Sequence, residues 1–537
     1  MRRPRGVAGV VVTVLSALLV WTALVLPGRL DRLGPGALVR LPLEAVLIGA
    51  LSLVLRGRWR PVAAVLGGTL LGMVVVLKVL DLAFRQSLDR PFDPVVDWQY
   101  AGSTVGLFRD SFGATSGLLL LGLLLGCLMA VVALLALALL RVLRRLAGHR
   151  ETVLRSTVLL AAVWAVLAAS GVRVTALPVA SAGAGEYLWA EASRVPAALQ
   201  DERDFRLATR SDPLAHVPAA RLLRGLRGKD VLVVFVESYG RVAVEGSSFA
   251  PGVRRVLRAG DRTLAAHGFG ARSAFLTSPT FGALSWLAHA TLQSGLWVDS
   301  QPRYDALVTS PRQTLSRAFG RAGWRTVSVV PADTRDWPEG RFYGWQRFYD
   351  ARNVGYAGPR FGYPTMPDQF TLSHFARTEL GPRPRRPVMA EIDLISSHAP
   401  WSRTPRLVDE ATIGDGAVFD PMPAQLPSAG DIWPSPTRVR AAYGTAVRYS
   451  LRSLLSFVTH HADRETVLLV LGDHQPATIV SGTDAGHDVP VSIVARDPAV
   501  LADIAAWGWS PGLLPGRQAP VWRMDRFRDR FLAAYAR

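Results

Sequence analysis

Long apolar stretches dominate the first third of the chain. Five of them have about the 17 to 25 residues that a helix needs to cross the hydrocarbon core of a bilayer. The second is the weakest of the five, because it is short and carries Glu44. The pattern predicts five membrane-spanning helices, at residues 7–26, 41–55, 61–84, 117–140 and 153–172.

Arginine clusters beside these stretches predict an orientation. The positive-inside rule places such clusters on the cytoplasmic side of the membrane. With all of them on that side, an odd number of crossings leaves the C-terminal two thirds of the chain outside. The sequence therefore predicts a multi-pass plasma membrane protein with an extracytoplasmic domain. The clusters are Arg2, Arg3 and Arg5, then Arg56, Arg58 and Arg60, and then Arg141, Arg144, Arg145 and Arg150.

The rest of the chain contains short, nearly continuous apolar runs with helical patterns between them. Runs without alternation are typical of strands that are buried on both faces. Strands that alternate with helices predict an α/β domain with a mainly parallel central sheet. The runs start at Val231, Thr326, Pro387, Thr466 and Val489. We expect a transmembrane domain of five helices at residues 1–175, an amphipathic linker at 176–225 and an extracytoplasmic α/β domain at 226–537.

Composition narrows the choice of cofactors and partners. The chain has 537 residues, a net charge of +19 and one cysteine. Because Cys127 lies inside an apolar stretch, no disulfide framework or thiolate zinc site is available, and oxygen and nitrogen must hold any metal. The positive charge is dispersed and almost all arginine, with Lys78 and Lys229 as the only lysines. We therefore expect the membrane bilayer, and no nucleic acid, as a partner.

Polar side chains follow two of the predicted strands. Glu237 comes directly after the run at 231–236, and Asp473 with His474 comes directly after the run at 466–472. The chemistry of open α/β sheets lies at the carboxyl ends of the strands. Carboxylates with one imidazole suit Zn²⁺ or Mn²⁺ and leave Mg²⁺ open. Each group alone also fits a structural role as a helix cap or turn, but together they predict one divalent metal site.

A hydroxyl-rich stretch lies between these groups, at residues 274–295. A Ser or Thr at the start of a helix has its oxygen near the positive end of the helix dipole, where free backbone N–H groups also hold a phosphate. We expect a hydroxyl nucleophile and an anionic substrate to meet there. The stretch supplies no adjacent general base, so a metal is needed to lower the pKa of the hydroxyl. The structural alternative is a simple helix cap.

The order of these groups resembles the alkaline phosphatase and sulfatase superfamily. It is Glu237 at a strand end, a hydroxyl at a helix start, the later His398, and then Asp473 with His474 at a late strand end. With five spans and an external domain, the chain most resembles the lipoteichoic acid synthase branch of phosphoglycerol transferases, to which lipid A phosphoethanolamine transferases are related. The resemblance covers nearly the whole chain in layout, through short motifs, and it implies an alkaline phosphatase-like fold.

Ser285 is the nucleophile that the resemblance favours. Sulfatases place theirs nine and ten residues ahead of a Thr-Gly or Ser-Gly pair, and Ser285 has that offset from Ser294 and Gly295. However, the formylglycine of sulfatases is made from Cys, and Leu287 and His289 replace the Pro and Arg of their motif. Hydrolysis of sulfate esters is therefore disfavoured.

The resemblance leaves the choice of nucleophile open and implies a metal-ligand set. Thr280 is the competing nucleophile, because relatives use Thr, and Thr277 or no nucleophile at all also stays open. One divalent ion, Mn²⁺, Mg²⁺ or Zn²⁺, is implied. Its ligands would be Glu237, Ser285, Asp473 and His474.

Four further residues are expected to contact substrate on the same resemblance. His398 resembles the family histidine that contacts the transferred phosphate or the leaving group, and a structural role fits it equally well. His487 resembles the additional histidine of phosphoethanolamine transferases. Trp337 and Arg341 resemble the Trp and Arg that hold the phosphoglycerol head group, with a packed aromatic loop as the alternative.

These features predict a membrane-anchored, metal-dependent transferase. It would move a phosphoglycerol-like group from a membrane phospholipid donor to a cell-envelope glycan or lipid acceptor, through a phospho-Ser or phospho-Thr intermediate. If water replaces the acceptor, the enzyme is a sulfatase-like hydrolase of phosphate or sulfate esters. The pattern also fits a phosphoethanolamine transferase, or a catalytically inactive membrane scaffold that keeps the fold and uses the external domain for binding.

Overall fold

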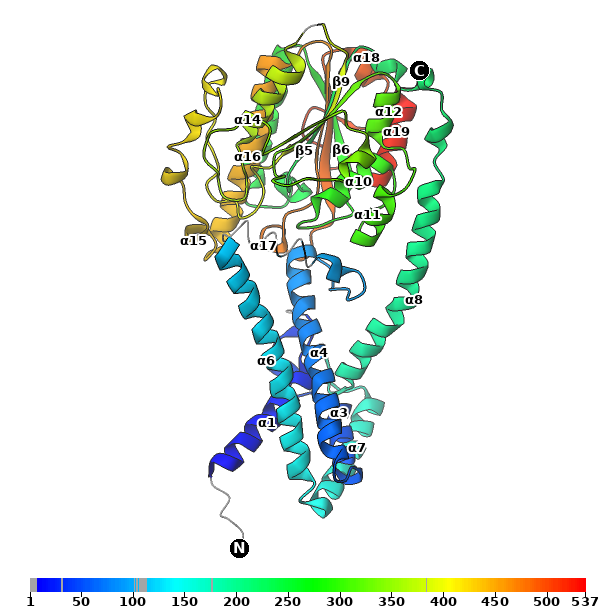
Figure 1. Cartoon of the computed structure of the whole chain (residues 1–537), viewed down its shortest axis with the longest axis vertical. Coiled ribbons are helices and arrows are strands. Elements are labelled where there is room, and N and C mark those ends of the chain that lie inside the picture. The colour runs from blue at the N-terminus through cyan, green and yellow to red at the C-terminus, as the bar shows by residue number, and fades with distance from the viewer. Residues whose placement is uncertain are drawn as a thin grey trace. The chain divides into compact units, whose positions relative to one another are not determined.

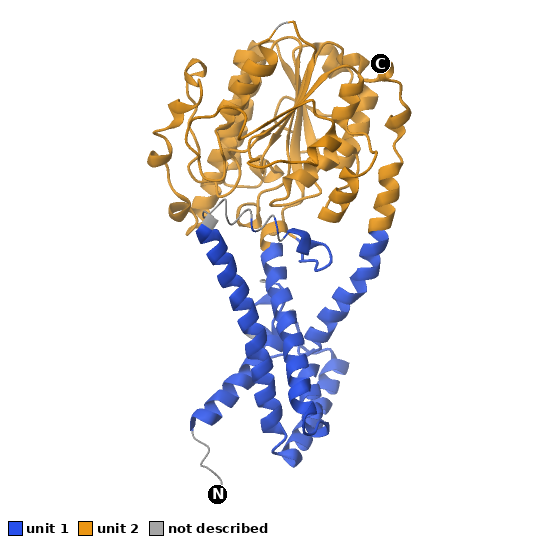
Figure 2. Cartoon of the chain, in the orientation of Figure 1, with its two compact units in different colours: residues 1–85, 90–201 blue, residues 86–89, 202–537 orange. Residues whose placement is uncertain are grey.

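The computed structural model describes residues 7–29, 32–100, 102, 105, 114–174, 177–382 and 384–537. The chain forms two compact units, which Figure 2 shows in two colours. Unit 1 comprises residues 1–85 and 90–201, and unit 2 comprises residues 86–89 and 202–537. Unit 1 is mostly helical, whereas unit 2 is built on a central sheet, so the division follows architecture as well.

Unit 1 is built from apolar helices. Four described helices are long and apolar enough to cross a membrane, so the prediction of five was wrong. The second predicted span forms the 12-residue helix α3, which rises only about 18 Å against a hydrocarbon core of about 30 Å. The long helices are α1 (Val7–Val25), α4 (Trp59–Leu88), α6 (Ala114–Leu146) and α7 (Arg150–Ser170). The remaining elements are α2 (Pro35–Leu38), β1 (Leu41–Pro42), α3 (Leu43–Val54), β2 (Arg173–Val174), β3 (Leu177–Pro178), β4 (Ala180–Ser181) and α8 (Gly183–Arg210).

Hydrogen bonds gather arginine-bearing helix ends at one end of unit 1. Arg141, near the end of α6, donates to the carbonyl oxygen of Gly9 and to the hydroxyl of Thr13 in the first turns of α1. Arg150, at the start of α7, donates to the carbonyl oxygen of Leu53 near the end of α3. The chain therefore reverses its direction at α3, although that helix is too short to span, and α7 ends at the opposite end of the unit.

Two sequence predictions fall partly or wholly outside the described residues. They are the arginine cluster at Arg2, Arg3 and Arg5, and the domain boundary at residues 175 and 176. The two later arginine clusters belong to the described part of the chain. One lies at the turn into α4 and in its first residues, and the other lies in the last turns of α6 and at the first residue of α7.

Unit 2 is organised around a sheet that has nine strands in its described residues. The order along the sheet is β12-β6-β11-β10-β5-β9-β7-β8, and β13 pairs with β6. Each of the five predicted apolar runs forms a strand. The strands are β5 (Asp230–Val236), β6 (Gly270–Thr277), β7 (Arg325–Val330), β8 (Arg347–Asp350), β9 (Val388–Leu394), β10 (Thr466–Gly472), β11 (Asp488–Ala495), β12 (Ser510–Pro511) and β13 (Val521–Arg523).

The sheet is mixed, so the prediction of a mainly parallel sheet was wrong. Strands β10, β5, β9, β7 and β8 run parallel to one another. In contrast, β11 is antiparallel to β10 and β6, and β12 is antiparallel to β6. The connection from β10 to β11 contains only the four-residue helix α17 (Thr478–Ser481). A parallel return to the neighbouring position usually needs a full crossover helix, so this short connection brings β11 back antiparallel.

Helices cover both faces of this sheet, as Figure 1 shows. Along β5, Leu232, Val234 and Val236 belong to the core on one face, whereas Val231, Val233 and Phe235 belong to the core on the opposite face. Burial on both faces explains the unbroken apolar sequence of the strand. The first core includes α9 (Ala250–Ala266), α14 (Asp368–Phe375) and α16 (Pro436–His461), and the second includes α10 (Ser285–Ser294), α12 (Leu315–Arg321), α18 (Pro498–Ala502) and α19 (Phe527–Ala534). The remaining helices are α11 (Gln301–Val308), α13 (Gly340–Tyr343) and α15 (Ala429–Ile432).

The backbone of Tyr239 lies so close to Gly472, at the end of β10, that no side chain fits there. A Cβ at Gly472 would lie 2.0 Å from the carbonyl oxygen of Tyr239, which cannot turn aside as a side chain can. We expect Gly472→Ala to destabilise unit 2 by about 1 to 3 kcal/mol, as overpacking does in a core, and to lower the midpoint of thermal unfolding. Gly486→Ala is the matched control, because no atom lies within 4 Å of the Cβ it would add. Equal midpoints for the two variants would contradict this packing.

Candidate metal and nucleophile site

Ser285 begins a helix directly after a strained residue. It is the first residue of the 10-residue helix α10. Leu284, which precedes it, has a φ of 69°, in the left-handed region that non-glycine residues rarely occupy. Such strain persists only where the surrounding structure enforces it, and it is concentrated at functional sites. The turn places the Ser285 hydroxyl at the positive end of α10, where free N–H groups also face an incoming anion.

The fold brings three of the predicted ligands to this hydroxyl. Ser285 Oγ donates to Glu237 Oε2 at 3.1 Å and lies 3.2 Å from His474 Nε2. His474 Nε2 lies 3.5 Å from Glu237 Oε1 and 3.4 Å from Asp473 Oδ2. The register explains this convergence, because the last residues of β5 and β10 pair with each other and an acidic residue follows each strand.

The remaining hydrogen bonds leave one ligand atom free on Asp473 and one on His474. Asp473 Oδ1 accepts from the backbone N–H groups of Ser238 and His474, both at 2.7 Å. Asp473 Oδ2 is buried and has no hydrogen-bond partner among the described residues. His474 Nδ1 lies 2.7 Å from the carbonyl oxygen of Gln475, and since only an N–H can donate to that carbonyl, the lone pair of neutral His474 is on Nε2. With Glu237, these atoms lie within 4.8 Å of one another and fit a divalent cation.

The charges of the cluster also favour a bound cation. Burial alone would raise the pKa of Glu237, but the charges of His398 and His474 and the hydrogen bond from Ser238 lower it to about 2. Burial, and then the charge of Glu237, raises the pKa of Asp473 to about 6. Two carboxylates with oxygens within 4.8 Å of each other disfavour each other's ionised form, and a dication between them removes that conflict.

The competing hydroxyls have different partners. Thr280 is 4% exposed, and its hydroxyl lies 3.4 Å from Ser278 Oγ. The Thr277 hydroxyl donates to Asp488 Oδ1 at 2.8 Å. No hydrogen bond in the described part of the chain joins either threonine hydroxyl to the ligand cluster, so the geometry favours Ser285 as the nucleophile.

The two further predicted histidines lie in different places. Among the charges that lower the pKa of Glu237, that of His398 is the largest. His398 Nδ1 lies 2.5 Å from the carbonyl oxygen of Ala399, and its ring stacks on Tyr363 with centroids 3.7 Å apart, so Nε2 is the nitrogen left for a substrate. The His487 ring lies against Phe281, with centroids 5.4 Å apart. Within the described residues, no hydrogen bond joins that ring to the cluster.

Trp337 belongs to an aromatic cluster behind the nucleophile helix. Its ring packs on Tyr343 with centroids 5.3 Å apart, and its Nε1 donates to the Tyr304 hydroxyl at 3.3 Å. Leu287 of α10 belongs to the same hydrophobic cluster. Arg341, in α13, is exposed. As far as the structure describes the chain, no hydrogen bond or ion pair joins Trp337 or Arg341 to the metal-ligand cluster.

A second group of ionisable residues lies one layer deeper on the same face of the sheet. His289, one helical turn after Ser285, lies 3.3 Å from Glu391 Oε1 and 3.6 Å from Asp393 Oδ1. Phe235 pairs with Asp393 in the sheet, and its ring stacks on His289 with centroids 3.8 Å apart. Burial would lower the pKa of His289, but the charges of Asp393 and Glu391 raise it to about 9. Burial raises the pKa of Asp393 to about 8, so at neutral pH a proton is shared within the pair of His289 and Asp393.

No role was predicted for these three residues from the sequence, although their spacing carried a signal. Ser285 and His289 are four residues apart, which places them on one face of a helix. Glu391 and Asp393 are two residues apart, which places them on one face of a strand. The apolar run from Pro387 contains both acids, but it was interpreted only as a buried strand. Two acids on one face of a buried strand indicate a polar layer inside the protein.

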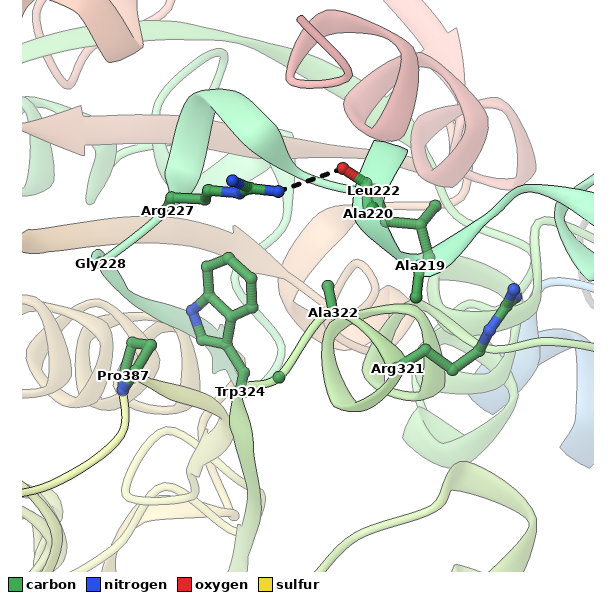
Figure 3. A pocket seen from close by; sticks show the side chains of 10 residues that line it. Ala219, Ala220, Leu222, Arg227, Gly228, Arg321, Ala322, Trp324 and Pro387 are labelled. Atoms are coloured by element: carbon green, nitrogen blue, oxygen red, sulfur yellow. Dashed lines mark hydrogen bonds between the residues drawn. The ribbon is translucent and has the colours of Figure 1, made fainter.

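The surface pocket in Figure 3 lies at the opposite end of the parallel strands. Its lining includes Gly228, Trp324 and Pro387, which lie just before β5, β7 and β9. Its two arginines, Arg227 and Arg321, already donate to backbone carbonyl oxygens nearby. Since ligands of open α/β sheets bind at the carboxyl ends of the strands, this pocket is not part of the candidate site.

The chain is similar to several proteins of known structure. No family model and no curated protein match the sequence. The chain is similar to the lipoteichoic acid synthase LtaP from Listeria monocytogenes, at 15% identity and a TM-score of 0.36, over 50% of this chain and 66% of that one. The match thus spans just under two thirds of the Listeria chain.

Two further matches are transferases by name. One is the soluble domain of lipooligosaccharide phosphoethanolamine transferase A from Neisseria meningitidis, at 12% identity and a TM-score of 0.37, over 59% of this chain and 92% of that one. The second is the phosphoglycerol transferase GacH from Streptococcus pyogenes, in complex with sn-glycerol-1-phosphate, at 10% identity and a TM-score of 0.34, over 64% and 92%. Lipoteichoic acid synthases and phosphoethanolamine transferases are also the proteins that the sequence motifs resemble. At such identities and scores, the activity of this chain has to be inferred from its own residues.

Asp473 Oδ2, which has no hydrogen-bond partner in the described residues, is predicted to bind the metal. In Asp473→Asn the amide oxygen can still accept from Ser238 and His474, but an NH₂ group replaces the free oxygen. We expect this variant to bind Mn²⁺ at least about 100-fold more weakly than the unmodified chain in calorimetric titration. Asp393→Asn, which neutralises a carboxylate of the deeper layer, is the matched control and should change the affinity less. A greater loss in the control would place the ion in the deeper layer.

The raised pKa of Asp473 predicts a pH dependence of metal binding. Because the carboxyl has a pKa of about 6 in the folded chain, it is ionised at pH 7 and must lose a proton to bind metal at pH 5. The affinity for Mn²⁺ should therefore be level above pH 6 and fall by about tenfold per pH unit below it. Titrations between pH 5 and pH 8 measure this, and an affinity that stays constant down to pH 5 would exclude Asp473 as the titrating ligand.

Proposed function

We propose that this chain is a membrane-anchored transferase that moves a phospho-alcohol group, such as phosphoglycerol, from a lipid donor to a cell-envelope acceptor. The proposal depends on the position of Ser285 Oγ at the start of α10, 3.1 Å from Glu237 Oε2 and 3.2 Å from His474 Nε2. A hydroxyl held by a carboxylate and an imidazole at the positive end of a helix is arranged to attack an anionic electrophile.

The proposed reaction is a double displacement. Ser285 Oγ attacks phosphorus in line, its bond to phosphorus forms, and the bond from phosphorus to the lipid alcohol breaks. The serine proton passes towards Glu237 Oε2, which accepts the hydrogen bond of this hydroxyl. As a cation, His398 would donate its Nε2–H to the departing lipid alcohol, which leaves with that proton. The acceptor hydroxyl would then give its proton to His398 Nε2 as it attacks the phosphoserine. The bond from phosphorus to Ser285 Oγ breaks, and Oγ takes its proton back from Glu237, which restores Ser285.

One divalent ion completes the proposed site. Glu237, Ser285, Asp473 and His474 would hold it, and Mn²⁺, Mg²⁺ and Zn²⁺ all suit this set of oxygen and nitrogen donors. When bound, such an ion lowers the pKa of the hydroxyl and offsets the negative charge of the phosphate. The orphaned Asp473 Oδ2 and the orientation of the His474 ring support this assignment.

The membrane unit supports a lipid donor. Four apolar helices are long enough to anchor the chain, so a phospholipid head group is a substrate that stays within reach of the anchored chain. We assign the arginine-bearing end of unit 1 to the cytoplasm, with residues 226–537 across the membrane from it as the catalytic domain. The acceptor there would be an envelope glycan or lipid. Trp337, Arg341 and His487 are proposed contacts to the donor head group or the acceptor.

The nucleophile is tested by trapping the intermediate. After incubation of the full-length protein with labelled phospholipid and Mn²⁺, mass spectrometry should find the transferred phospho-alcohol on Ser285, in the peptide from Ser273 to Arg303. Ser285→Ala should abolish the adduct and reduce turnover by roughly 10³ or more, because the covalent step is lost. Thr280→Val is the matched control and should retain both the adduct and turnover. An adduct on Thr280, or turnover retained in Ser285→Ala, would exclude Ser285.

The same assay separates a transferase from a hydrolase. Adding an acceptor alcohol should speed the loss of the adduct and yield a product that contains the acceptor. If release proceeds at one rate with or without the alcohol, and only water enters the product, then the site is that of a phosphodiesterase.

The proposed orientation is tested by cysteine labelling in intact cells. In a Cys127→Ala background, Gly486→Cys should react with a membrane-impermeant maleimide, whereas Arg58→Cys, between α3 and α4, should react only after permeabilisation. The reason is that the positive-inside rule keeps the arginine loop in the cytoplasm. The reverse labelling pattern would place the sheet-containing unit in the cytoplasm.

A further inference from the structure

Two neighbouring helices of unit 2 carry a row of arginines on their outer surface. Helices α9 and α16 pack side by side in parallel: a Cβ at Gly252 would lie 2.8 Å from Arg448 Nη1, and one at Gly260 would lie 2.9 Å from the Leu455 side chain. Their buried faces belong to the core of the sheet. We call the outer row the arginine strip, and it consists of Arg255, Arg258 and Arg262 on α9 and Arg448 and Arg452 on α16.

The arginine strip has no acidic counterpart in the described residues. Helix α16 contains no acidic residue, and the single acid of α9, Asp261, accepts from the backbone N–H of Leu513. No described ion pair involves any member of the strip. Elsewhere in unit 2, less exposed arginines are paired, as Arg385 is with Asp230 and Arg325 with Glu379. The strip therefore differs from these paired arginines in lacking a counter-charge.

At the centre of the strip, the guanidinium group of Arg448 lies close enough to those of Arg452 and Arg255 to be repelled by them. Burial, and then the charges of Arg452 and Arg255, lowers the pKa of Arg448. Repulsion among like charges opposes this arrangement in the isolated chain, and an anionic partner would offset it. Arginine presents a planar fork that matches two oxygens of a phosphate. The partner is therefore expected to be rich in phosphate.

The surroundings of the strip indicate what kind of anion it suits. Among the described residues of α9 and α16, no large hydrophobic side chain is exposed. A helix that inserts into a membrane surface exposes such side chains beside its cations, and single-stranded nucleic acid needs exposed aromatic rings for stacking. From Arg255 to Arg262 the strip extends about 10 Å along α9, which exceeds a single phosphate. These features favour an extended chain of phosphates that is held by charge alone.

We propose that the arginine strip binds a linear polyanion with closely spaced phosphates. We identify this polyanion with the growing acceptor, to which phospho-alcohol groups are added, and this identification rests on the proposed transfer reaction. Helix α16 connects the two regions, because the hydroxyl of Tyr443, five residues before Arg448, donates to the carbonyl oxygen of Ser238 beside Glu237. The strip would thus hold the acceptor on the same rigid unit that carries the nucleophile.

The test measures binding of labelled inorganic polyphosphate to the full-length protein. The strip variant combines Arg255→Gln, Arg448→Gln and Arg452→Gln. The matched control combines Arg464→Gln, Arg496→Gln and Arg517→Gln, which removes the same charge from exposed positions outside both helices. We expect the strip variant to bind at least about tenfold more weakly than the control and to show a shallower dependence of affinity on salt, because fewer phosphates are neutralised.

Three further measurements decide what the result means. Thermal unfolding and turnover of a small phosphodiester should be the same in both triple variants, and Arg452→Glu alone replaces the strip variant if that variant unfolds early. Equal polyphosphate affinity in the two variants would overturn the proposal. A greater loss of binding to anionic phospholipid vesicles, or to single-stranded DNA, than to polyphosphate would assign the strip to a membrane or a nucleic acid instead. Polyphosphate binding requires no turnover, so it can fail while the Ser285 adduct still forms, and the reverse also holds.

Discussion

Two strands that end side by side impose the main electrostatic constraint on this molecule. β5 and β10 are parallel and pair up to Val236 and Gly472, so the carboxylates of Glu237 and Asp473 emerge next to each other at a buried edge. Two such charges are costly unless a positive group lies between them. Beside these carboxylates lie an imidazole and a hydroxyl, and one carboxylate oxygen has no hydrogen-bond partner in the described residues. A divalent ion satisfies all of these groups together.

Four residues of helix α10, which begins at Ser285, advance by nearly the same distance as two residues of a strand, so the side chains of the site lie in two layers. Four residues of a helix rise about 6 Å, and two residues of a strand rise about 6.6 Å. Ser285 therefore lies at the level of Glu237, and His289 lies at the level of Asp393 beside Phe235. The upper layer contains the predicted ligands and the hydroxyl, while the lower layer places an imidazole beside two acids. This arrangement ties the position of the nucleophile to the core of the sheet.

Opposite charges are separated between the interior and the surface of unit 2. The acids at the carboxyl ends of β5, β9 and β10 lie inside, where a cation suits them, and the arginines of α9 and α16 lie outside, where an anion suits them. Burial makes an unpaired charge far more costly than exposure does. This difference explains why the inner acids gather polar partners from several elements, while the outer arginines remain without acidic partners in the described residues.

Local patterns in the sequence were enough to predict the four long apolar helices, the strands β5, β7, β9, β10 and β11, and the polar residues that follow β5 and β10, but not strand β6. They overestimated the number of spanning helices, since the length of α3 is limited by turns that composition does not show. They also missed the antiparallel direction of strand β11, which depends on how the chain returns after α17. Three-dimensional packing was needed to place Glu237 and His474 on the Ser285 hydroxyl and to join His289 to Glu391 and Asp393. Distance between residues far apart in the chain is set by strand register and helix packing, and neither of these is a local property of the sequence.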